Sequence, residues 1–174
     1  MHAPSSLTTG LVHASASRIH HGERSFFEVR ASGFVHALPE QAWQVLTDYG
    51  RLADFVPDLL SSRLLSRNGF EAIVEQRSEV GLLFATHTIH MVERIAEQPF
   101  STIEVALVSG DMKHYKACWD LAPSMQNGAS GTRITYTGAM VPDFFIPPVL
   151  GESVVQANMK KMVEAVIAEI ERRH

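Results

Sequence analysis

The feature that most constrains the fold is one long amphipathic helix predicted at the end of the chain, directly after a series of strands. Residues 148–172 carry apolar side chains at helical spacing, and such a helix is about 37 Å long at 1.5 Å per residue. Prolines within residues 142–148 separate it from the preceding strand. Because an apolar face of this length must be buried, the sequence predicts a sheet curled around the helix. Such a sheet tends to leave a cavity beneath the helix.

The order of the remaining elements predicts the sheet. Residues 25–37 alternate as a strand does, Pro39 begins a short helix, and residues 52–56 form a second helical turn. About six further strands follow, with Asn68-Gly69 as the strongest hairpin signal. Short connections predict antiparallel neighbours. The expected fold is therefore α+β: a curved antiparallel sheet of about seven strands that grips a long C-terminal helix, with two short helices after the first strand.

The N-terminal segment differs in composition from the rest of the chain. Residues 1–24 are rich in Ser, Thr, Ala and His and lack apolar periodicity, so we expect a flexible arm before one domain at residues 25–174. The histidines of the arm are interpreted as solvated, with adventitious metal binding as the alternative, because no carboxylate or cysteine joins them at ligand spacing. We expect neither a metal site nor a cofactor.

Composition excludes several classes of function. The net charge of −4 over 174 residues is not that of a nucleic-acid-binding surface, so no nucleic-acid partner is expected. The single cysteine, Cys118, excludes an internal disulfide framework. No apolar run reaches the length of a membrane span, and no signal peptide is recognisable, so we expect a cytoplasmic protein. The sequence does not indicate an oligomeric state.

Several segments resemble those of a known family. They are AWQVLTDY at 42–49, FVP at 55–57, WDL at 119–121, GTRITY at 131–136 and the segment 144–148. With these segments the chain is similar to bacterial polyketide cyclase/dehydrase-type proteins of the START-like, helix-grip (SRPBCC) superfamily, close to the ubiquinone-binding Coq-type START proteins. The resemblance covers about residues 25–172 and consists of fold markers rather than catalytic signatures.

The resemblance implies a cavity for an apolar small molecule such as a lipid, a quinone, a polyketide or a hydroxylated aromatic compound. The leading hypothesis is a binding protein that shields such a ligand from water. An aromatase/cyclase that uses Tyr115, His87 or Tyr136 for proton transfer is the alternative, and the sequence leaves open whether the protein is an enzyme. A ribosome-interacting, toxin-like role is a third possibility, against which the acidic charge balance argues.

Strand and helix periodicity selects the candidate ligand-binding residues. Those predicted to point inward are Tyr115, Trp119, Tyr136, Val105, Ile134, His87, Asn158 and Met162. The tyrosine and tryptophan side chains would offer rings with polar tips, whereas the alternative is a filled core without a ligand. His87 could act as a base or bind a ligand carbonyl, or could be a core histidine bonded to the backbone. Asn158 interrupts the apolar stripe of the helix and could bind the ligand or the sheet. Met162 belongs to a methionine cluster that suits an adaptable pocket or simple gap filling.

Overall fold

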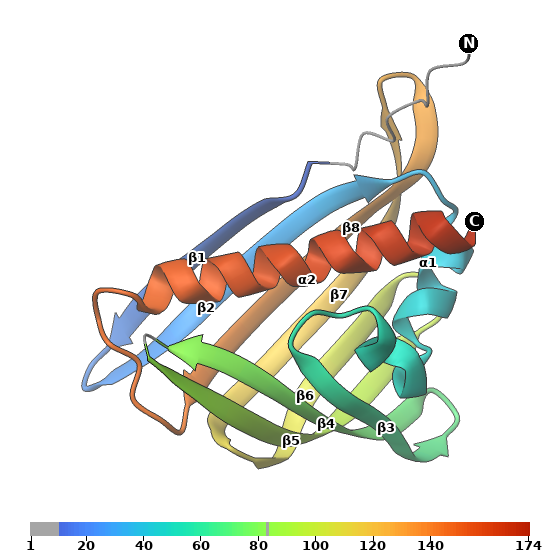
Figure 1. The fold of residues 1–174 in the computed structure, drawn as a ribbon. Coiled ribbons are helices and arrows are strands. Elements are labelled where there is room, and N and C mark those ends of the chain that lie inside the picture. Colours follow the sequence, from blue (N-terminus) through green and yellow to red (C-terminus); the bar gives the residue numbers. More distant parts are fainter. Residues whose placement is uncertain (1–10, 83) are drawn as a thin grey trace.

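The computed structural model describes residues 11–82 and 84–174 (Figure 1). Within these residues the chain forms eight strands, two α-helices and one 3-10 helix. Their order is β1 His13–His21, β2 Arg24–Val35, α1 Pro39–Leu46, η1 Tyr49–Asp54, β3 Leu59–Asn68, β4 Glu71–Leu82, β5 Ala85–Gln98, β6 Thr102–Gly110, β7 Met112–Gln126, β8 Ala129–Pro142 and α2 Gly151–Arg173. None of the helices in this part of the chain is long and apolar enough to cross a membrane.

The described strands belong to one antiparallel sheet with the order β1-β2-β8-β7-β6-β5-β4-β3. The sheet curls, so that α2 lies along its concave side above β1 and β2 while β3 to β6 form the opposite wall (Figure 1). The predicted α+β fold with a sheet around one long helix is confirmed. The sheet has eight strands in the described residues where about seven were predicted.

The additional strand is β1, and it corrects the expectation of an arm without regular structure. Residues 13–21 pair with β2 over their whole length, from His13 opposite Ser32 to His21 opposite Arg24. Ala14 and Ala16 alternate with exposed serines and pack against the core. The alternation was present in the sequence but is built from small side chains, which give little apolar periodicity. Residues 1–10, the rest of the expected arm, lie outside the described residues.

Helix α2 packs on the sheet most closely near its C-terminal end. Val163, Val166, Ile167 and Ile170 are at most 1% exposed. A Cβ atom placed on Gly33 of β2 would lie 2.6 Å from Cδ1 of Ile167, so the glycine lets the helix approach the strand. Further towards the N-terminus, Val154, Asn158 and Met159 of α2 are half-buried. The helix therefore packs directly on the sheet beside Gly33 and borders an open space between Val154 and Met162.

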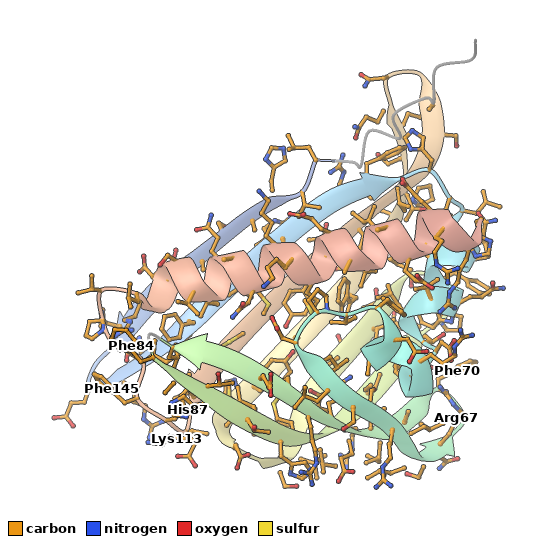
Figure 2. All side chains as sticks on the ribbon, in the orientation of Figure 1. Arg67, Phe70, Phe84, His87, Lys113 and Phe145 are labelled. Carbon is orange, nitrogen blue, oxygen red and sulfur yellow. The ribbon has the colours of Figure 1, made fainter. Side chains whose placement is uncertain are left out.

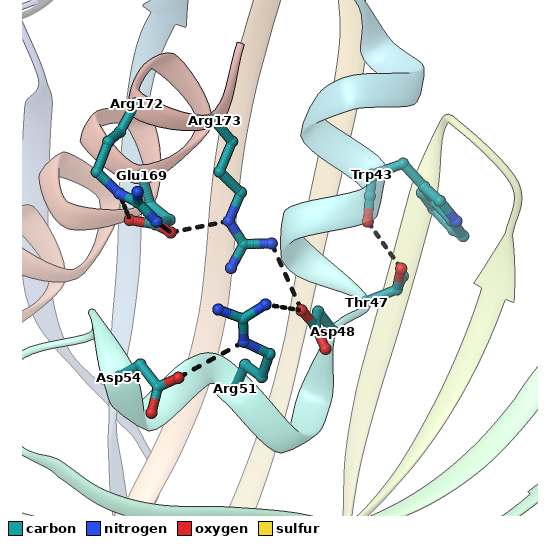
Figure 3. A network of polar contacts seen from close by, with 8 residues as sticks. All are labelled: Trp43, Thr47, Asp48, Arg51, Asp54, Glu169, Arg172 and Arg173. Carbon is teal, nitrogen blue, oxygen red and sulfur yellow. Dashed lines mark hydrogen bonds and ion pairs between the residues drawn. The ribbon is translucent and has the colours of Figure 1, made fainter.

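A polar network fixes the packed end of α2 to the short helices (Figure 3). Glu169 accepts hydrogen bonds from Arg172 and Arg173, and Arg173 also reaches Asp48 with an N–O separation of 3.4 Å. Arg172, assisted by Arg173, holds the pKa of Glu169 at about 2 although burial acts in the opposite direction. Arg51 bridges Asp48 and Asp54 within η1. These contacts connect the end of the chain to the segment that follows β2.

Candidate functional site

A cavity of about 240 Å³ lies between the concave face of the sheet and the N-terminal half of α2. Its wall is predominantly apolar and comes from η1, β4 to β8, α2 and the loops beside them. The side chains that line it include Tyr49, Gln76, Met91, Glu93, Val105, Met112, Tyr115, Trp119, Tyr136, Met140, Phe144, Asn158, Met159 and Met162. The volume exceeds the roughly 150 Å³ of a cavity that holds benzene and lies just below the range of drug-sized sites, which begins near 300 Å³.

Two tyrosines provide hydroxyl groups in this apolar wall. Tyr115 of β7 and Tyr136 of β8 lie on adjacent strands, and their hydroxyl oxygens are 2.8 Å apart. Trp119 contacts Tyr136 edge to face, with ring centroids 5.0 Å apart. Burial raises the pKa of both tyrosines, so both are neutral at physiological pH. One hydroxyl donates to the other, which leaves one O–H of the pair free to donate to a third group.

Glu93 is an acidic residue in the apolar wall of the cavity, and it is not among the residues predicted from the sequence. It lies on β5, lines the cavity and is 4% exposed. Burial raises its pKa to about 7, and no hydrogen bond or cation within the described residues opposes that effect. The carboxylate also raises the pKa of Tyr115 and Tyr136, which places it in their electrostatic neighbourhood. The site therefore holds a carboxyl group that can be ionised or neutral near pH 7.

Two amide side chains add further polar groups. Asn158 of α2, for which the sequence left open a contact with the ligand or with the sheet, is half-buried and lines the cavity. Gln76 of β4 also lines the cavity, and its side-chain nitrogen donates to Oγ of Ser62 across the β3–β4 pair at 3.2 Å. These amides lie on elements other than β7 and β8. Polar atoms are therefore available to a ligand from several directions.

A second buried glutamate, Glu97, lies four residues further along β5 and does not line the cavity. Two guanidinium nitrogens of Arg67 donate to its carboxylate at 2.8 and 3.0 Å, and the hydroxyl of Tyr49 donates at 2.6 Å. Burial would raise the pKa of Glu97, but these donors outweigh it and lower the pKa below its ordinary value. This hydrogen-bonded cluster joins η1, β3 and β5 beside the cavity.

The exposed members of the cavity wall define its rim. Asp58 of the η1–β3 loop and Glu79 of β4 are exposed and line the cavity. Lys161 of α2 reaches Asp58 with an N–O separation of 3.5 Å, so an ion pair spans the rim. In Figure 2, Phe84, His87, Lys113 and Phe145 lie at one end of the molecule, and Arg67 and Phe70 lie at the other.

The structure brings six of the eight predicted ligand-binding residues to the cavity: Tyr115, Trp119, Tyr136, Val105, Asn158 and Met162. It does not bring His87 and Ile134 to the cavity wall. His87 is half-buried and stacks on the ring of Phe144 at a centroid distance of 5.1 Å. Ile134 is fully buried, but it lies opposite Gly33, where α2 packs directly on the sheet. Strand alternation predicted the inward face correctly but not the extent of the cavity along it.

Glu93 could have been found from the same alternation. It shares a strand face with His87, which was predicted to point inward, and with Ile89 and Met91. A glutamate on a strand is ordinarily a solvated residue, so its type alone indicated the outer face. The register of β5 decides otherwise, since Glu93 lies beside Val74 of β4 and Leu107 of β6 within the concave wall.

Comparison with solved structures identifies the same architecture in proteins of low sequence identity. A STAR-related lipid transfer protein fragment from Xanthomonas axonopodis is 18% identical, with a TM-score of 0.69 over 90% of this chain and 98% of that chain. A START superfamily protein from Mycobacterium smegmatis is 13% identical, with a TM-score of 0.70 over 84% and 99%. The Zhui aromatase/cyclase from Streptomyces sp. R1128 is 18% identical, with a TM-score of 0.68 over 85% and 95%. These similarities show the fold.

The sequence itself assigns the family. No curated protein sequence matches the chain significantly. A family model described as polyketide cyclase/dehydrase and lipid transport matches residues 35–167, which span the region from the end of β2 to the packed part of α2. Because this match covers more than half of the sequence, the chain belongs to the polyketide cyclase/dehydrase and lipid transport family.

Proposed function

We propose that this protein binds one apolar small molecule in the cavity between the sheet and α2 and shields it from water. The observation that carries the proposal is the cavity itself, because a soluble domain of this size ordinarily fills its core to high density. The wall is mostly apolar, with a few polar groups that can orient a ligand. Its volume favours a molecule larger than benzene.

The wall is also suited to ligands of more than one shape. Met91, Met112, Met140, Met159 and Met162 all line the cavity. Methionine side chains are flexible and polarizable, so they can repack around different apolar surfaces. The family description names both polyketide cyclisation and lipid transport, and relatives with either description share this fold. Ligand binding is the property that both activities require.

A cavity-filling variant tests the proposal. Equilibrium dialysis of the protein against 2-methylnaphthalene should show one saturable site in the wild type. Met162→Trp should reduce the affinity at least tenfold, because the larger side chain occupies the cavity. Met125→Trp is the matched control, since Met125 is 68% exposed near the β7–β8 turn and should leave binding unchanged. Absence of binding by the wild type, or equal binding by Met162→Trp, would contradict the proposal.

Glu93 and the tyrosine pair support an aromatase/cyclase-type enzyme as the second candidate. A carboxyl group with a pKa of about 7 is matched to proton transfer at neutral pH, and a neutral tyrosine O–H can stabilise a developing oxyanion. The expected elementary step is removal of a proton from the carbon beside a ketone by the Glu93 carboxylate, with the enolate oxygen hydrogen-bonded to a tyrosine. Deuterium exchange into 2-tetralone in D2O, followed by NMR, should then be faster with wild-type protein than with Glu93→Met. Equal exchange rates would remove this candidate.

A further inference from the structure

The cavity contains a polar group without a partner. Glu93 is 96% buried, lines the cavity, and burial is the single cause that displaces its pKa. No hydrogen bond or ion pair joins its carboxyl oxygens to another described residue, and the side chain lies in the wall of the cavity. A buried carboxyl group is costly unless hydrogen bonds satisfy it. A ligand group is the natural source of these bonds.

The tyrosine pair lines the same cavity and can donate a hydrogen bond, whereas an ionised Glu93 can only accept one. Tyr115 and Tyr136 use one hydroxyl hydrogen between themselves and retain one for an outside acceptor. No hydrogen bond joins either tyrosine to Glu93 within the described residues, although the charge of Glu93 influences both. The carboxylate and the tyrosine pair line one cavity without bonding to each other, so a ligand there has both available to it.

This arrangement discriminates among ligand groups. When Glu93 is ionised, a ketone or quinone oxygen accepts from tyrosine but leaves the carboxylate without a donor. An ammonium group donates to the carboxylate but cannot accept from tyrosine. A hydroxyl group does both, because it carries one O–H donor and acceptor lone pairs. A purely hydrocarbon ligand satisfies neither side.

Resting on the proposed binding function, we infer that the ligand carries a hydroxyl group, which donates to the carboxylate of Glu93 and accepts from the Tyr115–Tyr136 pair. Glu93 is thus the specificity-determining residue of the cavity. The remaining ligand surface is apolar and lies against the methionine-rich wall. The inference concerns the chemical class of the ligand, an apolar phenol or alcohol.

The test compares two probes of similar size that differ at one group, 2-naphthol and 2-methylnaphthalene. Equilibrium dialysis gives the ratio of their Kd values for the wild type and for Glu93→Met, which replaces the carboxylate by an apolar side chain of similar length. Hydrogen bonds to a charged group correspond to roughly tenfold or more in affinity. The preference for 2-naphthol should therefore fall by about tenfold or more in Glu93→Met, while 2-methylnaphthalene binds at least as well.

Glu104→Met provides the matched control, because Glu104 is acidic and lies on the neighbouring strand β6 but is exposed and does not line the cavity. It should leave the ratio of Kd values unchanged. If the wild type and Glu93→Met bind both probes with the same ratio, the inference is overturned while the proposed binding function stands. If the wild type binds neither probe, the proposed function itself fails. Retained binding of 2-methylnaphthalene by Glu93→Met shows that the variant keeps its cavity, and Glu93→Gln repeats the comparison with the smallest change of shape.

Discussion

Glu93 and Glu97 lie four residues apart on the same face of β5, and both are buried, yet their surroundings differ completely. Glu97 has a bidentate arginine and a tyrosine hydroxyl, and its pKa is lowered. Glu93 has no such partners within the described residues, and its pKa is raised to about 7. The difference shows that a buried acidic residue can have two roles in this fold. A paired carboxylate joins strands and helices, whereas an unpaired one facing a cavity marks a site where a ligand supplies the missing bonds.

The largest expected effect comes from removing the cation of the paired site. Arg67→Met leaves the Glu97 carboxylate, which is 5% exposed, without its guanidinium partner. We expect the free energy of unfolding at pH 7.5 to fall by about 3 kcal/mol, measured by urea denaturation. Because pairing lowers the folded-state pKa of Glu97, its contribution is present above the ordinary value of 4.5 and is lost as the pH falls below it. The difference between the variant and the wild type should therefore narrow in acid.

Arg63→Met is the control for this prediction. Arg63 pairs with Glu75 at 2.9 Å, but its side chain is 68% exposed. A solvated ion pair of this kind contributes less than about 1 kcal/mol. An equal loss of stability in the two arginine variants would contradict the distinction between the paired Glu97 site and the ordinary surface.

The unpaired site predicts the opposite response to pH. Burial raises the pKa of Glu93 from 4.5 to about 7, so the contribution of this group to stability is fully present below pH 4.5, where it is protonated. The contribution is lost as the pH rises through 7, because the buried group then ionises. Glu93→Met removes the titration. Its stability relative to the wild type should therefore increase by about 3 kcal/mol between pH 4.5 and pH 8.5, as an upper estimate from the size of the shift. A stability difference that is constant over this range would show that ionisation of Glu93 does not lower the stability of the folded state. Other groups would then stabilise its charge.

A smaller effect on stability is expected from the hydrogen bond between the two tyrosines of the cavity. Tyr136→Phe and Tyr115→Phe each delete one partner of the same hydrogen bond. Each should lower the free energy of unfolding by about 1 kcal/mol. Because one bond is shared, the double variant should cost little more than either single variant in thermal or urea denaturation. Additive losses would indicate that the hydroxyls are bonded independently to other groups.

The sequence was sufficient to predict the helix, most strands and the inward face of each strand. The stripe of α2 is buried at Val155, Val163, Val166 and Ile170, as its spacing indicated, because a helix of this length has no alternative surface to cover. The first strand of the chain escaped prediction, since Ala14 and Ala16 contribute too little apolar surface to distinguish a strand from a solvated tail. Edge strands of small residues form because the neighbouring strand offers backbone hydrogen bonds, which the side-chain pattern does not reveal.

The position of the cavity was less predictable than the fold. Alternation gives the same inward orientation to Ile134 and Tyr136, but α2 packs directly on the sheet beside Ile134, whereas Tyr136 borders the cavity. His87 has the inward phase of β5 but stacks on Phe144 and does not line the cavity, although its neighbour Val80 does. These outcomes depend on sheet curvature and on the small residue Gly33. Neither is encoded in the periodicity of one strand.

Five methionines inside the cavity allow the most direct test of ligand binding at this place. Protein labelled with 13C in its methionine methyl groups should be titrated with 2-naphthol and followed by NMR. Ring currents from the bound probe should shift the methyl signals of residues distributed around the wall, namely Met91, Met112, Met140, Met159 and Met162. The signal of Met125, which is 68% exposed near the β7–β8 turn, should stay in place and serves as the internal control. Saturable shifts of the cavity methyl groups are the result predicted here, whereas shifts confined to Met125, or none at saturating 2-naphthol, would contradict a ligand-binding cavity between the sheet and α2.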